Sequence, residues 1–169
     1  MSALTPLGIV HTAISLVAVG AGVIALVRDR QISPSTRIGQ VYLWATVLTC
    51  LTGFGIFQHG GFGKPHALGI ITLVLLAAAF VAPRVVFFGR RAVPIATAIW
   101  SFTFFLHLVP GITETSTRLP VDSPFFPNAD DPTLAKVIAG AAVVSFVLIA
   151  LQWRRGAKTI SAGQAAGRA

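Results

Sequence analysis

The side chains best suited to chemistry are the chain's four histidines, each of which lies inside a long apolar run or close to one. Neutral imidazole binds zinc, copper, iron and nickel, and a pair of imidazoles from two helices can supply the axial ligands of a b-type haem. We therefore take His11, His66 and His107 as candidate ligands of a transition metal ion or haem. His59, in the glycine-rich segment before His66, is a secondary candidate.

Three charged residues could complete such a site. Glu114 follows His107 closely and could serve as a carboxylate ligand, an orienting hydrogen-bond partner or a general base. Lys64 and Arg118 are candidate partners of haem propionates or of another anion. A plainer interpretation stays open, in which His11 and His107 bond only to serine or threonine across helices.

The composition places these residues in a membrane protein. Of the 169 residues, 54% are hydrophobic and 11% are charged, and the mean hydropathy is +0.80. Soluble domains carry about 25% charged residues. The formal net charge is +8, but the basic residues form short clusters beside apolar runs, which disfavours nucleic acid as a partner. The single cysteine, Cys50, excludes an intrachain disulfide bond.

Five apolar runs predict an all-α bundle of transmembrane helices within one domain, residues 1–158. We expect Tyr42 and Trp44, at the start of the second run, to lie at the membrane interface. Residues 111–133 are expected to form an outer loop or lid, and 159–169 a flexible cytoplasmic tail. The predicted spans are about 7–27, 41–57, 66–84, 92–109 and 134–153.

The distribution of basic residues predicts the orientation. Five spans place ten of the 13 Lys and Arg residues on the side of the C-terminus, so this side is cytoplasmic and the N-terminus is outside. All four histidines then fall on the outer side, and His11, His66 and His107 are expected to approach one another. Ala18 and Gly22 form a small-residue face that favours close helix packing, including a homo-oligomer.

Three segments carry a resemblance to known proteins: His11 in the first run, Arg37-Ile-Gly-Gln-Val-Tyr42 and Gly63-Lys-Pro-His-Ala-Leu-Gly69. Together they resemble a family of uncharacterised bacterial multi-pass membrane proteins. The family pattern usually has a histidine just before the Arg-x-Gly-x-x-Tyr element, where this chain has Thr36. Histidines in adjacent helices are also loosely similar to those of small b-type membrane cytochromes. The resemblance implies a helical protein of the bacterial inner membrane and assigns no activity.

The leading hypothesis is an outer-side histidine cluster that binds a metal ion, such as zinc, copper or iron, or one b-type haem. Such a protein would serve electron transfer or metal handling, with a quinone or a periplasmic redox protein as partner. One alternative is a membrane protein that binds a quinone, a lipid or another small molecule. A further alternative is an accessory subunit of a larger membrane complex. Whether the protein is an enzyme is left open, because catalytic and storage metal sites can share the same sequence spacing.

Overall fold

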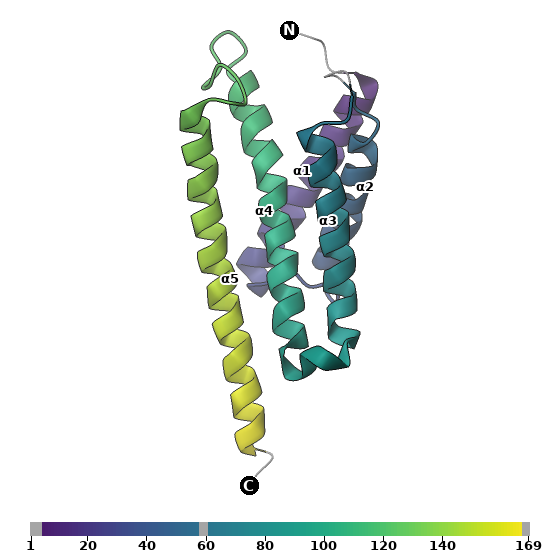
Figure 1. The fold of residues 1–169 in the computed structure, drawn as a ribbon, viewed down its shortest axis with the longest axis vertical. Helices are drawn as coiled ribbons and strands as arrows, with labels where there is room; N and C mark the ends of the chain where they lie inside the picture. The colour runs from purple at the N-terminus through teal and green to yellow at the C-terminus, as the bar shows by residue number, and fades with distance from the viewer. Residues whose placement is uncertain (1–4, 58–60, 167–169) are drawn as a thin grey trace.

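Five long helices make up the fold, in agreement with the predicted all-α class. The computed structural model describes residues 5–57 and 61–166, with side chains up to residue 157. Within these ranges there is no strand, and the helices run along the length of the molecule (Figure 1). In chain order they are α1 (Pro6–Ile24), α2 (Arg37–Gly53), α3 (Lys64–Val81), α4 (Ala92–Arg118) and α5 (Pro132–Ala166).

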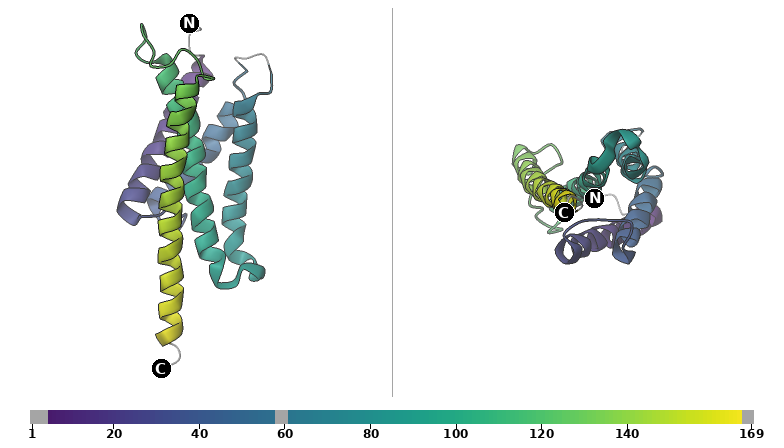
Figure 2. Two further views of the ribbon diagram at one scale, coloured as in Figure 1. Left: turned by 60° about the vertical axis from the view of Figure 1, so that its left-hand side comes forward. Right: turned by 90° about the horizontal axis from the view of Figure 1, so that it is seen from below.

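Consecutive helices are neighbours in space. α1 packs on α2, α2 on α3, α3 on α4, and α4 on α5. Seen along the long axis in Figure 2, the five helices follow one another around an open arc. The core lies where α1, α2, α3 and α4 meet, and it combines the rings of Tyr42, Trp100 and Phe104 with small alanines. α5 lies outside this core.

The small-residue face of α1 is buried, as its sequence predicts. Ala18 is fully buried, and a Cβ atom added at Gly22 would lie 2.5 Å from Phe104 Cε2 and 3.2 Å from Tyr42 Cδ2. Glycine is therefore needed for α2 and α4 to approach α1 this closely. This contact is made within one chain, and formation of a homo-oligomer stays a prediction.

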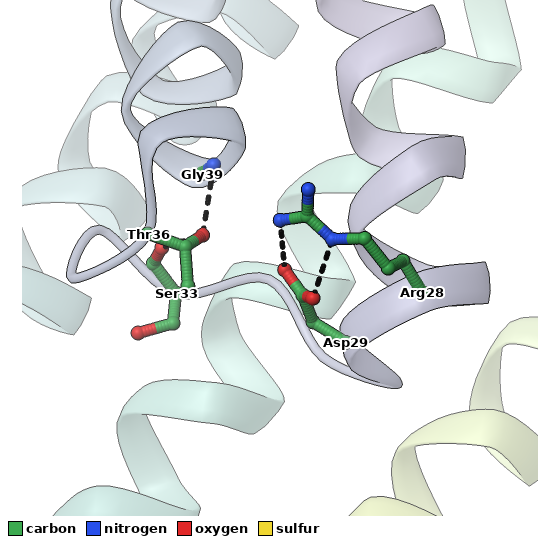
Figure 3. A network of polar contacts seen from close by, with 5 residues as sticks. All are labelled: Arg28, Asp29, Ser33, Thr36 and Gly39. Atoms are coloured by element: carbon green, nitrogen blue, oxygen red, sulfur yellow. Dashed lines mark hydrogen bonds and ion pairs between the residues drawn. The ribbon is translucent and has the colours of Figure 1, made fainter.

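A polar turn joins α1 to α2 (Figure 3). Arg28 donates two hydrogen bonds to the carboxylate of Asp29, at 2.7 and 2.8 Å. Thr36 Oγ1 donates to the carbonyl oxygen of Ser33 at 3.1 Å and accepts from the backbone N–H of Gly39, also at 3.1 Å. A side chain at position 39 would collide with that carbonyl group, so the turn requires glycine there. The cap explains why α2 begins at residue 37, four residues before the predicted start.

α4 continues through Pro110, where the sequence analysis ends the helix. Proline removes one backbone hydrogen bond, but the helix goes on to Arg118. Past the proline, three hydroxyl groups donate to backbone carbonyl oxygens one turn earlier. The predicted end at residue 109 is therefore too early, and the first part of the expected 111–133 loop is helical. The three bonds run from Thr113 to Val109 (2.9 Å), Ser116 to Ile112 (2.6 Å) and Thr117 to Thr113 (2.8 Å).

The other helices lie close to their predicted positions. α1 is followed by a π-helical turn, and α3 ends one 3₁₀ turn before Val85. α5 extends beyond the predicted 134–153 at both ends, and its backbone remains helical through residue 166 of the expected tail. α2 ends at Gly53, so residues 54–57 form a turn rather than the last turn of the helix.

Four of the helical segments in the described part of the chain are long and apolar enough to cross a membrane. α2, with 17 residues, is shorter than these four. Many large apolar side chains on the outside of the bundle are exposed, which is the expected arrangement for helices surrounded by lipid. The chain is therefore a membrane protein. The four segments are Pro6–Asp29, Lys64–Arg84, Val86–Arg118 and Pro132–Ala157.

Candidate functional site

His11 is held by α2. Its Nδ1 atom lies 3.0 Å from Oγ1 of Thr52. Thr52 donates its own hydroxyl proton to the carbonyl oxygen of Leu48 at 2.8 Å, so its oxygen accepts from His11. We therefore assign the proton of the neutral ring to Nδ1. This assignment leaves the lone pair on Nε2, the nitrogen that a metal ion would bind.

His107 is buried on α4, with 6% of its surface exposed. Its Nε2 atom has no hydrogen-bond partner among the described residues. The ring centroid lies 6.4 Å from that of Tyr42, which is completely buried. A buried imidazole nitrogen without a partner costs about 1–3 kcal/mol of folding free energy. A ligand bound to Nε2 of His107 would recover this cost.

His11 lies in the second turn of α1, and His107 lies in the second half of α4. They lie close enough for their charges to interact, and the carboxylate of Glu114 interacts electrostatically with His11. Glu114 also forms an ion pair with Arg118 at 2.5 Å, one turn along α4. Because α4 continues past Pro110, Glu114 and His107 lie on the same helix. Of the predicted site residues, His107 and Glu114 therefore share one helix, and both interact electrostatically with His11 on α1.

His66 has a structural role at the start of α3. Its Nδ1 atom accepts a hydrogen bond from the backbone N–H of Gly63 at 3.3 Å, which closes the first turn of the helix. Three rings stack on the imidazole, at centroid distances of 6.5 Å for Phe54, 5.1 Å for Phe57 and 5.3 Å for Phe62. Since the lone pair of Nδ1 is engaged, the neutral ring carries its proton on Nε2. In this tautomer His66 offers no free lone pair to a metal ion, although its buried Nε2 atom, like that of His107, has no hydrogen-bond partner among the described residues.

The expected three-histidine site is not assembled in this part of the chain. Among the residues whose side chains are described, no three His, Cys, Asp or Glu side chains form a group that could hold one metal ion. His66 belongs to the aromatic cluster, whereas His11 is held by Thr52 and His107 lies beside Tyr42. His59 lies outside the described residues.

The two candidate anion-binding cations are paired with carboxylates. Lys64 lies 3.2 Å from Asp130, in an ion pair whose side chains are 94% and 84% exposed, and Arg118 is paired with Glu114. The first pair connects the start of α3 to the segment before α5, and exposed pairs of this kind contribute about 0–1 kcal/mol. A bound anion would therefore have to compete with carboxylates for both cations.

Sequence reasoning missed two residues that matter to the histidine pair. Tyr42 does not lie at the interface as expected, because it is completely buried and its hydroxyl oxygen lies 2.9 Å from Oγ1 of Thr103. Thr103 uses its own proton on the carbonyl oxygen of Trp100, so it accepts from Tyr42. Thr52, which orients His11, was the other omission. Their signal in the sequence is weak, since threonine and tyrosine are common in spanning helices.

Comparisons with protein-family models, with curated proteins and with solved structures found no match to this chain. The resemblance to a family of bacterial multi-pass membrane proteins stays a prediction. The candidate site is therefore defined by two histidines, a half-buried His11 held by Thr52 and a buried His107 beside Tyr42, with Glu114 in electrostatic range of His11.

Proposed function

We propose that this chain is an integral protein of the bacterial inner membrane whose outer-side histidine pair, His11 and His107, binds a metal-centred redox cofactor. The observation that carries the proposal is the buried Nε2 atom of His107, which has no partner among the described residues; His107 also interacts electrostatically with His11, whose Nε2 lone pair is free. Ionisable side chains inside spanning helices usually line functional sites.

The proposed topology has five spans, with α2 as the shortest of them. Support comes from the four long apolar helices and from the concentration of Lys and Arg on one side. In this arrangement the N-terminus and the loop before α5 face outward, and the C-terminus faces the cytoplasm. Both histidines of the pair then lie in the outer half of the membrane.

The donor set fits iron or copper better than zinc. Imidazole nitrogen suits all three metals, but structural zinc takes four protein ligands and catalytic zinc takes three. The described residues offer a pair of imidazoles with one nearby carboxylate, and no group of three ligands. A b-type haem requires only two axial ligands from the protein, and His11 and His107 would supply them. When bound, a haem or a copper ion would provide one-electron transfer.

The surrounding residues prepare the pair for this role. Thr52 fixes the tautomer and the orientation of His11 by accepting from Nδ1. Burial around His107 keeps water from its Nε2 atom, which strengthens any electrostatic interaction there. Glu114, which is paired with Arg118, places a carboxylate charge in electrostatic range of His11.

A combined spectroscopic and elemental measurement tests the proposal. The purified protein in detergent should show either a Soret band or about one equivalent of copper or iron. Substitution of either ligand, His11→Gln or His107→Gln, should remove the cofactor. His66→Gln provides the matched control, because this histidine lies on the same side and caps a helix, and it should retain the cofactor. A clean spectrum with no metal in the wild-type protein would exclude this function.

A second candidate function is binding of a quinone or another small apolar molecule. A groove of about 310 Å³ lies between α4, α5 and the π-helical turn after α1, and Phe104, Leu108 and Leu148 line it together with Ser101 and Ser145. Organic extraction of the purified protein would release such a ligand in stoichiometric amount. This function predicts that His107→Gln leaves the extracted amount unchanged, whereas Ser145→Leu, which fills the groove, reduces it.

A further inference from the structure

A second groove, of about 560 Å³, follows the contact between α1 and α2. Its walls are apolar along most of its length: Ile14 and Val17 come from α1, and Trp44 and Leu48 come from α2. One end is polar, because Arg37 and Gln40 lie at the start of α2. The groove thus has an amphipathic lining, with the charge at one end and apolar surface beyond it.

The length of the groove matches one leaflet of a bilayer. Along α2 its lining residues recur with helical spacing from Arg37 to Leu48, a distance of about 16 Å at the rise of an α-helix. One leaflet of a hydrocarbon core is about 15 Å thick. With Arg37 at the cytoplasmic surface, the apolar part of the groove reaches to about the middle of the membrane. An acyl chain of the inner leaflet has this depth.

The polar end of the groove carries an unbalanced positive charge. Neither Arg37 nor Gln40 has a side-chain hydrogen bond or an ion pair within the part of the chain whose side chains are described. Both residues are exposed. Arg28, by contrast, is neutralised by the adjacent Asp29. A guanidinium group presents five N–H donors in a planar arrangement that fits phosphate, and the amide of Gln40 adds further donors.

We propose that this groove binds one anionic phospholipid of the inner leaflet. Arg37 and Gln40 hold the phosphate, and one acyl chain lies between the α1 wall of Ile14 and Val17 and the α2 wall that ends at Leu48. The net positive charge of the polar end favours a lipid with a net negative charge over a zwitterionic one. The inference uses the proposed topology but does not depend on cofactor binding by the histidines.

Lipid titration of the purified full-length protein tests this assignment. Phosphatidylglycerol added to the protein in a neutral detergent should raise its unfolding temperature more than phosphatidylcholine with the same acyl chains does. Arg37→Gln should weaken binding of phosphatidylglycerol about tenfold, because one charge-assisted hydrogen-bonding group is lost. The control is Arg90→Gln, which removes an exposed arginine from the same side of the protein, outside the groove, and should leave the affinity unchanged.

A pair of phenylalanine substitutions separates the groove from general lipid contact. Val17→Phe places a ring in the groove and should reduce lipid binding at least as much as Arg37→Gln does. Val143→Phe changes an exposed position of α5 outside the groove and should have no effect. Equal stabilisation by the two lipids, or an unchanged preference in Arg37→Gln, would overturn the proposal. Stabilisation by inorganic phosphate alone to the same extent would also overturn it, since the site would then bind a free anion.

Discussion

His11 Nδ1 and Thr52 Oγ1 lie 3.0 Å apart, and this contact connects α1 to the last turn of α2. Because the threonine gives its proton to a backbone carbonyl group, it fixes the imidazole in the tautomer that has its lone pair on Nε2. The histidine is therefore prepared for a ligand by a residue that would not contact that ligand itself. The same relationship leads to a direct test.

Removing the orienting hydroxyl should weaken cofactor binding. In Thr52→Val the shape of the side chain is retained but the hydrogen bond to His11 is lost, and the affinity for haem or metal should fall by a factor of about 10–100. Titration of the cofactor-free protein, followed by absorption, measures this change. Thr12→Val is the control, because its hydroxyl bonds only to the carbonyl oxygen of Gly8 in the same helix. Equal affinity in Thr52→Val and the wild type would contradict this role.

The Nε2 atom of His107, which has no partner among the described residues, leads to a prediction about the free energy of unfolding. In cofactor-free protein, His107→Leu should leave the free energy of unfolding unchanged or raise it by about 1 kcal/mol, because a buried polar group without a partner is removed. His107→Ala should lower it by about 2–4 kcal/mol, since a cavity replaces the ring. Denaturant unfolding in detergent compares the two. An equal loss of stability in both variants would contradict this prediction, because it would show that polar interactions hold the ring of His107.

His66 should affect stability without affecting the cofactor. His66→Leu removes the acceptor for the N–H of Gly63 and should destabilise the protein by about 1 kcal/mol. His66→Gln keeps a side-chain acceptor at the third helical position and should cost less. Thermal unfolding together with cofactor content gives both readouts. Loss of cofactor in His66→Gln would show that this histidine belongs to the binding site after all.

Two glycines one half-turn apart on α1 provide a matched test of the packing around Tyr42. Gly22→Ala should destabilise the protein by about 1–3 kcal/mol, because the new methyl group overlaps the buried ring of Phe104. Gly20→Ala meets nothing within 4 Å and should stabilise the helix by about 0.5–1 kcal/mol. Unfolding measurements on both variants decide the point. A neutral Gly22→Ala would mean that α1 and α4 are farther apart than they are here.

The proposed orientation can be tested by cysteine labelling in intact cells. Asp122→Cys lies in the exposed segment between α4 and α5 and should react with a membrane-impermeant maleimide. Arg90→Cys lies in the turn before α4 and should react only after the membrane is permeabilised. The native Cys50 is buried and provides a low background. The reverse labelling pattern would invert the topology, and the histidine pair would then lie on the cytoplasmic side.

The sequence predicts the general architecture because its signals are local. Long apolar runs require helices in a membrane, and the turns between them are marked by proline, glycine and charged residues. The same logic predicts the buried face of Ala18 and Gly22 on α1. It fails at Pro110, where helix propensity indicates an end but the hydroxyl groups of the following turn and the packing of α4 allow the helix to continue.

The candidate site could be predicted only in part for a related reason. Residue type and topology identify His11, His107 and Glu114 as residues of one side, and in the structure His107 and Glu114 interact electrostatically with His11. The rotation of each helix is set by packing that involves all of its neighbours, and sequence spacing does not contain this information. Only the tertiary structure therefore decides that His66 turns into an aromatic cluster and caps α3.

What the sequence determined by itself is thus a helical membrane protein with histidines gathered toward one end. The tertiary structure decided what each described histidine contacts, and how Thr52 prepares His11 for a ligand. It also placed Tyr42 inside the bundle, where its hydroxyl group bonds across to Thr103. The physical reason is that apolar length sets whether a helix forms and crosses the membrane, whereas side-chain contacts between helices set which polar groups share the interior.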